Sequence, residues 1–147
     1  MQISNYKTQQ EKIVCTTVMP TRKIPGMLED IRESLLRKPR SLSPKYFYDQ
    51  RGSSLFDQIC STPEYYPTRT ENKLLSRHAV DIINKTTPDQ ILELGSGYST
   101  KTRLLFDACQ QTTNECIYVP LDVCEEVLVE VSKRLSEEYD WLVVNPL

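Results

Sequence analysis

The stretch that decides the fold is Ile91-Leu92-Glu93-Leu94-Gly95-Ser96-Gly97, in the second half of the 147-residue chain. Residues 90–94 form a short apolar run of strand length, and the Gly-Ser-Gly triplet after them predicts a tight turn. Glycines at such a turn let a ligand lie directly against the backbone, because a Cβ at either position would obstruct it. The stretch therefore predicts a strand that ends in a ligand-binding turn.

The residues that follow alternate between helical and strand-like patterns. Helical spacing over 102–109 and 125–139 separates strand-like runs at 116–121 and 141–144. Strands that alternate with helices of this length form βαβ units around a parallel sheet. The expected fold class is α/β, with a Rossmann-like parallel sheet and helices on both faces.

Asp122 follows the second predicted strand, twenty-five residues after Gly97. An acid at this spacing, at the carboxyl edge of the neighbouring strand, can accept hydrogen bonds from both ribose hydroxyls of a nucleoside. The Gly-x-Gly turn alone is compatible with an ordinary strand-to-helix connection. Together with Asp122 it favours a site for a nucleoside cofactor.

The acid Glu93 before the turn and the lack of a third glycine after it resemble motif I of the class I methyltransferases. In that motif the turn, here Gly95, Ser96 and Gly97, supports the amino-acid part of S-adenosylmethionine. Lys101 then lies where it could neutralise the carboxylate of the cofactor. A solvated lysine in the first turn of a helix fits the spacing equally well.

The chain divides into three predicted parts. Residues 1–26 show little periodicity and predict an arm or an edge strand, residues 27–85 predict a helical region, and residues 86–147 predict the Rossmann-like domain. Within the helical region, helices are expected at Met27–Leu36, Leu55–Ile59 and 71–83, with a turn at 51–53 and a loop at 64–70. Thr70 is the expected N-cap of the third helix. The residues expected on the inner face of that helix are Leu74, Leu75, Ala79, Ile82 and Ile83.

Composition excludes several classes of function. The net charge of −2 gives no electrostatic footprint for nucleic acid or an anionic membrane. The five cysteines show no metal-ligand spacing, so no metal site is expected. With no apolar run of signal-peptide or membrane-span length, the chain is expected to be cytoplasmic with reduced thiols.

The order of four motifs closely resembles the histidine-specific methyltransferase family, whose type members are the L-histidine Nα-methyltransferases of ergothioneine biosynthesis. The resemblance runs from about Leu35 to Tyr139 and depends on the segments 43–49, 52–59, 63–71 and 93–103. Of these, the Tyr-Tyr-Pro-Thr-Arg sequence at 65–69 is not a general methyltransferase feature.

This resemblance implies S-adenosylmethionine-dependent trimethylation of the α-amino group of L-histidine to hercynine. It implies that Tyr65 contacts the substrate histidine, that Tyr48 lies near its amino group, and that Gly95, Lys101 and Asp122 bind the cofactor. No residue is assigned a catalytic role, because the methyl group is already activated and the protein mainly orients two reactants. For Tyr65 the alternative is an aromatic residue packed in a loop.

Members of this family continue well beyond the point reached by Leu147. The expectation is therefore a truncated Rossmann-like domain that is inactive alone, with an exposed sheet edge that a second polypeptide or self-association covers. Two alternatives remain open. The chain is one half of a split enzyme, or it is a non-catalytic module that binds a nucleoside ligand or a protein partner.

Overall fold

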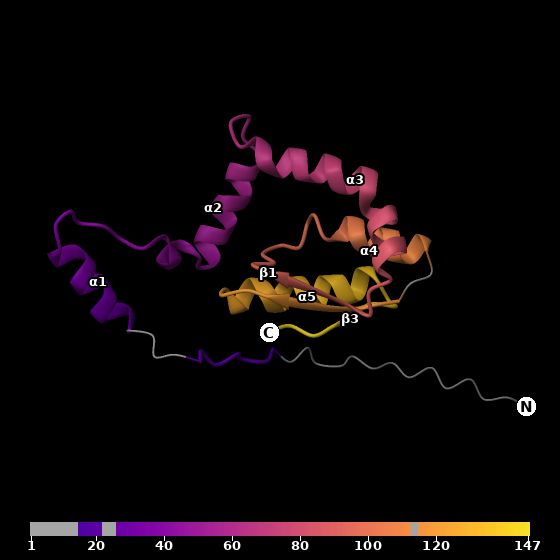
Figure 1. Ribbon diagram of the computed structural model, residues 1–147. Helices are drawn as coiled ribbons and strands as arrows, with labels where there is room; N and C mark the ends of the chain where they lie inside the picture. The colour runs from indigo at the N-terminus through magenta and orange to yellow at the C-terminus, as the bar shows by residue number, and fades with distance from the viewer. Residues whose placement is uncertain (1–14, 22–25, 113–114) are drawn as a thin grey trace, which may run out of the picture.

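The computed structural model describes residues 15–21, 26–112 and 115–147, and its elements alternate in the second half of the chain as expected (Figure 1). In order they are α1 (Met27–Leu36), the short 3-10 helix η1 (Pro44–Phe47), α2 (Gln50–Cys60), α3 (Tyr66–Thr86), β1 (Gln90–Leu94), α4 (Arg103–Gln111), β2 (Ile117–Leu121), α5 (Glu125–Glu138) and β3 (Val143–Val144).

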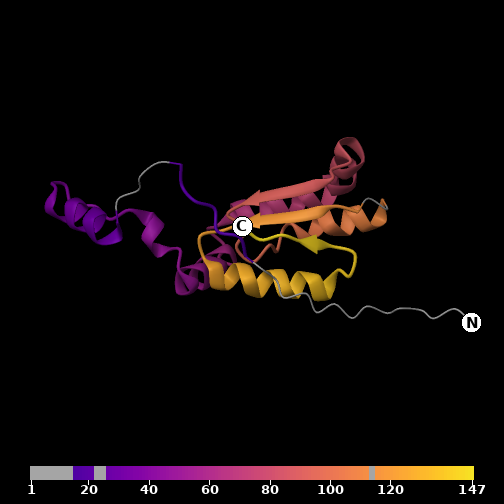
Figure 2. The same cartoon turned by 90° about the horizontal axis from the view of Figure 1, so that it is seen from below.

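The three strands form one parallel sheet in the order β1-β2-β3 (Figure 2). Ile91 pairs with Tyr118 and Leu94 with Leu121, so the carboxyl ends of β1 and β2 lie side by side. β3 is shorter than the predicted run and pairs with β2 through Val143 and Val144. The α/β, Rossmann-like fold class is confirmed.

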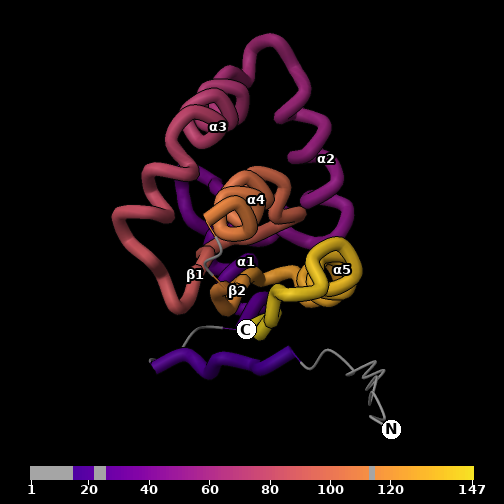
Figure 3. Tube along the Cα trace, turned by 90° about the vertical axis from the view of Figure 1, so that its right-hand side faces the viewer, coloured from indigo at the N-terminus to yellow at the C-terminus, as the bar shows by residue number. Residues whose placement is uncertain are grey.

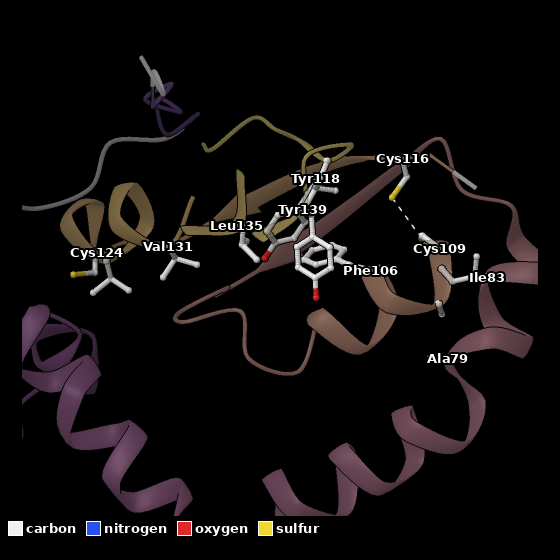
Figure 4. Close-up of a cluster of buried hydrophobic side chains, with 13 residues drawn as sticks. Ala79, Ile83, Phe106, Cys109, Cys116, Tyr118, Cys124, Val131, Leu135 and Tyr139 are labelled. Carbon is white, nitrogen blue, oxygen red and sulfur yellow. Dashed lines mark hydrogen bonds between the residues drawn. The ribbon is translucent and has the colours of Figure 1, made fainter. Parts of the chain in front are cut away.

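The core lies between the sheet and the helices that follow β1 and β2 (Figure 4). The ring of Phe106 on α4 meets the ring of Tyr118 on β2 edge to face, with centroids 4.9 Å apart. It meets the ring of Tyr139 in the same manner at 5.5 Å. Val131 and Leu135 of α5 belong to the same buried cluster, so α4 and α5 share one core.

Both of these helices lie on one side of β1 and β2 (Figure 3). Two successive right-handed crossovers in the same direction along a sheet place their helices on the same face. On the other face, Leu92 is 60% exposed and Leu94 is 73% exposed. Within the described residues, the expectation of helices on both faces is therefore met on one face only.

The helix α3 begins earlier than predicted. Residues 66–70, expected as a loop, are its first turn, and Thr70 lies inside the helix while Tyr65 is the N-cap residue. Pro67 explains the early start, because proline fits the first turn, where its missing N–H costs no hydrogen bond. Of the predicted inner face only Ala79 and Ile83 are buried.

Gly52 lies in the first turn of α2, and the predicted turn at 51–53 is wrong. The Gly52 N–H donates to the Oδ1 atom of Asp49, the N-cap residue, at 2.7 Å. A Cβ at Gly52 would lie 1.5 Å from the carbonyl oxygen of Phe47. This glycine is therefore needed for a close approach of η1 to α2 and not for a turn.

Part of the predicted N-terminal arm is described. Residues 15–20 have no regular secondary structure, and the Thr16 N–H donates to the carbonyl oxygen of Pro146 at 3.0 Å. This hydrogen bond places the segment beside the residues after β3. Residues 1–14 and 22–25, which belong to the predicted arm, lie outside the described residues. Among the described helices, none combines the length and the hydropathy that crossing a membrane requires.

Candidate cofactor and substrate site

A cavity of about 500 Å³ lies between the helical region and the carboxyl ends of β1 and β2. Figure 2 shows η1 and α2 beyond the ends toward which these strands point. The carboxyl edge of a parallel sheet is where ligands bind in folds of this type. The lining includes all eight residues singled out from the sequence: Tyr48, Tyr65, Glu93, Gly95, Ser96, Gly97, Lys101 and Asp122.

The turn after β1 has the backbone conformation that glycine favours. Gly95 has a φ of +71° and Gly97 a φ of +47°, both in the left-handed region. A Cβ built at either position would meet no atom within 4 Å, so the space in front of the turn is open to a ligand. The Ser96 hydroxyl is buried and has no hydrogen-bond partner within the described residues.

Asp122 joins the turn to the end of β2. Its Oδ2 atom accepts a hydrogen bond from the Gly97 N–H at 2.8 Å, and its Oδ1 atom accepts one from the Cys124 N–H at 3.0 Å. The N–H groups of Gly95 and Ser96 also donate to the carbonyl oxygen of Leu121. Each carboxylate oxygen has further lone pairs, so the side chain can still accept ligand hydroxyls.

Glu93 is bound by neighbouring side chains of the protein. Its Oε2 atom accepts hydrogen bonds from the hydroxyls of Tyr118 at 2.5 Å and Thr102 at 2.6 Å. Burial, followed by the charge of Glu93, raises the pKa of Tyr118, so this hydroxyl stays protonated and donates. The hydroxyl of Tyr118 is also hydrogen-bonded to the hydroxyl of Ser99, with 2.8 Å between the two oxygen atoms.

The sequence did not identify Tyr118 as part of this arrangement. Its side chain is fully buried and lies on the same face of the sheet as Glu93. Side chains alternate between the two faces along β2, so the sequence pattern is consistent with this position. That pattern predicts the face on which a side chain lies but not its hydrogen-bond partner. The network ties β1, β2 and the loop after the turn into one unit.

Lys101 forms an ion pair with Glu71 of α3, thirty residues away in the sequence. Both side chains line the cavity. Lys101 is therefore partly exposed and also paired. Glu71 is a cavity residue that the sequence did not single out. Arg103, nearby, donates to the carbonyl oxygens of Tyr98 and Ser99 and pairs with Glu138 at the end of α5.

Tyr65 and Tyr48 come from the helical region on the other wall of the cavity. The ring of Tyr65 is half-buried and meets the ring of Phe56 edge to face, with centroids 5.7 Å apart. Arg69 donates to the carbonyl oxygens of Thr62 and Pro63, at 2.6 and 2.5 Å, in the connection before Tyr65. This connection fixes where the tyrosine enters the cavity.

The cysteines are free thiols. The Sγ atoms of Cys109 and Cys116 lie 3.7 Å apart in the core, and burial raises the pKa of the Cys116 thiol to about 12. Among the residues that the structure describes, no three histidine, cysteine or acidic side chains are grouped so that they could hold a metal ion.

A parallel sheet whose first strand ends in a left-handed Gly-x-Gly turn, with an acid at the end of the next strand, defines a Rossmann-like, nucleoside-cofactor-binding domain of the class I methyltransferase type. The chain belongs to the histidine-specific, S-adenosylmethionine-dependent methyltransferase family, whose sequence profile matches residues 27–147. S-adenosylmethionine is the cofactor of that family.

Two mycobacterial relatives support this assignment. The chain is 43% identical over 120 residues to the histidine N-alpha-methyltransferase of Mycolicibacterium smegmatis and 41% identical over 120 residues to that of Mycobacterium tuberculosis. Each alignment covers 82% of this chain and 37% of the relative. The chain is also 36% identical over 91 residues to the ergothioneine biosynthesis protein 1 of Neurospora crassa, with 61% of this chain and 10% of the relative covered.

Proposed function

We propose that this chain binds S-adenosylmethionine as part of an N-methyltransferase that acts on the α-amino group of L-histidine, giving hercynine in ergothioneine biosynthesis. The observation that carries the proposal is that the two tyrosines of the helical region line the same cavity as the Gly-x-Gly turn and Asp122. The names of the mycobacterial and Neurospora relatives support histidine as the acceptor and ergothioneine as the pathway.

The residues on the sheet side of the cavity fit the cofactor. The open space in front of Gly95 and Gly97 accommodates a ligand against bare backbone, and Asp122 retains acceptor capacity for ribose hydroxyls. Lys101 supplies a positive charge at the same wall. When bound, S-adenosylmethionine supplies a methyl group that its sulfonium has already activated.

The residues on the helical side then have to hold and orient an amine. Tyr48 and Tyr65 carry hydroxyls that accept and donate hydrogen bonds without adding a charge that competes with the amine. Orientation of two reactants accounts for a large part of the rate of such a transfer, so no nucleophile of the protein is required. In this proposal the helical region at 27–85 supplies substrate contacts and residues 86–147 supply cofactor contacts.

We do not expect methyl transfer from these 147 residues alone. The chain spans 37% of the length of its mycobacterial relatives, and the face of β1 that carries Leu92 and Leu94 is open to solvent. We propose that further polypeptide, from the same or another chain, covers this face in the active enzyme. A module that binds a nucleoside without catalysis is the second candidate, favoured by the same open face.

The test is to incubate the purified chain with S-adenosylmethionine and L-histidine and to measure both binding and product. Calorimetry reports cofactor binding, and mass spectrometry reports methylated histidine. Binding of S-adenosylmethionine supports the proposed cofactor site, and binding that tightens in the presence of L-histidine supports the methyltransferase over the second candidate. Methylated histidine from the chain alone would overturn the expectation that further polypeptide is needed. A chain that binds neither S-adenosylmethionine nor its demethylated product contradicts the proposal.

A further inference from the structure

The ion pair between Glu71 and Lys101 joins the two walls of the cavity. Glu71 belongs to α3, and Lys101 belongs to the loop after the Gly-x-Gly turn. Their side chains are 52% and 35% exposed, so the pair is in contact with solvent. Exposed pairs of this kind contribute only about 0–1 kcal/mol to stability. Their shared position on the cavity lining is therefore the more informative feature.

Glu71 differs from two other carboxylates of this cavity in what it binds. Glu93 is held by the hydroxyls of Tyr118 and Thr102, and Asp122 by two backbone N–H groups. Glu71 makes its hydrogen bond, within the described residues, to Lys101. Its carboxylate is thus free to exchange one cation for another when a ligand enters.

We propose that Glu71 and Lys101 together bind the zwitterionic amino-acid end of the cofactor, with Glu71 accepting hydrogen bonds from its α-ammonium group and Lys101 donating to its carboxylate. A pair of opposite charges is complementary to a zwitterion, because each ligand charge meets an opposite protein charge. The Glu71 contact is the new element, and it rests on the proposed function, since it requires the nucleoside to lie against the turn.

Three ligands separate the contributions, and all lack the charged sulfonium. S-adenosylhomocysteine has the complete amino-acid end, S-adenosyl-3-thiopropylamine has the amine without the carboxylate, and 5′-methylthioadenosine has neither. Glu71→Gln should lower the affinity for the first two by about tenfold, as expected for loss of a charge-assisted hydrogen bond, and leave the third within twofold. Lys101→Gln should lower the affinity only for S-adenosylhomocysteine.

Two matched variants complete the measurement by calorimetry. Asp57→Asn changes another carboxylate of the cavity lining, and Glu130→Gln changes an exposed ion pair on α5 that lies outside it. Glu130→Gln should alter the affinity for none of the three ligands. Asp57→Asn should lower the affinity for the two ligands with an amine by less than twofold, because in this inference Glu71 and not Asp57 accepts the hydrogen bonds of the amine. Thermal unfolding of each variant should match the parent protein, since all of these side chains are partly exposed.

Other outcomes overturn the inference. If Glu71→Gln weakens the binding of all three ligands equally, Glu71 is structural. If it strengthens the binding of S-adenosylhomocysteine, Glu71 competes with the ligand for Lys101. If Asp57→Asn causes the loss instead, Asp57 holds the amine. A parent protein that binds none of the ligands contradicts the proposed function itself, whereas a parent that binds them and a variant that matches it contradict only the role of Glu71.

Discussion

The Oδ2 atom of Asp122 accepts a hydrogen bond from the backbone N–H of Gly97 at 2.8 Å, and this contact connects the ends of two adjacent parallel strands. The same side chain accepts from the Cys124 N–H through its other oxygen. Asp122 therefore shapes the turn as well as offering acceptors to a ligand. A substitution there should affect the cofactor site in both respects.

Asp122→Asn should weaken S-adenosylhomocysteine binding at least tenfold. The amide puts an NH₂ donor where the carboxylate has an acceptor oxygen, so a charge-assisted hydrogen bond worth roughly 1.5–3 kcal/mol is lost. In one orientation this NH₂ group also faces a backbone N–H, which is another donor. Calorimetry measures the change. Asp140→Asn, at an exposed position outside the cavity, is the control and should bind as the parent does. Unchanged affinity in Asp122→Asn would rule out this placement of the ribose.

Gly97→Ala should reduce both stability and cofactor affinity. An alanine at a φ of +47° costs about 1–2 kcal/mol, and its methyl group would occupy space in front of the turn. Gly26→Ala is the matched control, because Gly26 has a φ of −61° and open space around it. Urea unfolding and ligand titration of the two variants test the difference. Equal behaviour of both would mean that the turn has no special backbone requirement.

Tyr65→Phe should leave S-adenosylhomocysteine binding intact and weaken binding of L-histidine. The substitution keeps the ring contact with Phe56 and removes only the hydroxyl. Titration of L-histidine into the cofactor-saturated protein measures the effect in any form that binds histidine. Tyr66→Phe is the control, since that side chain is 67% exposed and does not line the cavity. Loss of cofactor binding in Tyr65→Phe would show instead that Tyr65 is structural.

The raised pKa of Tyr118 should cause part of the loss of stability at alkaline pH. Its folded pKa is raised, so above the ordinary tyrosine pKa of about 10 the unfolded chain releases the proton while the folded protein retains it. The contribution of Tyr118 to the free energy of unfolding is therefore fully present below about pH 10 and falls as the pH rises further. Tyr118→Phe should lower the unfolding free energy at neutral pH by about 1–3 kcal/mol, because Glu93 loses a donor.

The same variant should also show a shallower loss of stability between neutral and strongly alkaline pH. Urea unfolding at several pH values gives both quantities. Tyr66→Phe again serves as the control, and it should keep the slope of the parent protein. An identical slope in Tyr118→Phe would mean that other groups with raised pKa values, such as the Cys116 thiol, account for the alkaline loss.

Leu94→Gln should reduce self-association of the chain. Leu92 and Leu94 expose apolar side chains on the open face of β1, and exposed apolar sheet surface favours association. Sedimentation velocity over a range of concentrations should show association of the parent and less of the variant. Leu28→Gln, at an 84% exposed position on α1, tests whether any exposed leucine has this effect. A parent that stays monomeric would show that the open face does not drive association.

The sequence predicts the strand, turn and acid on the sheet side of the cavity because these signals are local. The glycines, the apolar run before them and the spacing to Asp122 each follow from the chain itself. The position of Glu71 beside Lys101 could not be predicted in this way, since it depends on how α3 lies against the turn. The hydrogen bond from Tyr118 to Glu93 likewise depends on strand register.

Two features of the structure depend on spatial context that local sequence signals do not contain. Gly52 predicts a turn in isolation, but it is required because the carbonyl group of Phe47 approaches α2 closely. The alternation of strands and helices predicts helices around the sheet but does not say how many of them share a face. Handedness instead places α4 and α5 together, which leaves Leu92 and Leu94 uncovered by described residues.

The charges on the cavity wall determine which form of the proposed cofactor the cavity would hold more tightly. Its lining carries one ammonium group, on Lys101, and four carboxylates, on Asp57, Glu71, Glu93 and Asp122. Such a wall attracts a cation more strongly than a neutral molecule of the same shape. A methyl donor with a sulfonium is cationic at sulfur, and the thioether left behind is not. In the proposed methyltransferase these carboxylates would therefore hold the cationic donor more tightly than the thioether left after transfer, which would favour exchange of the spent nucleoside for a new donor.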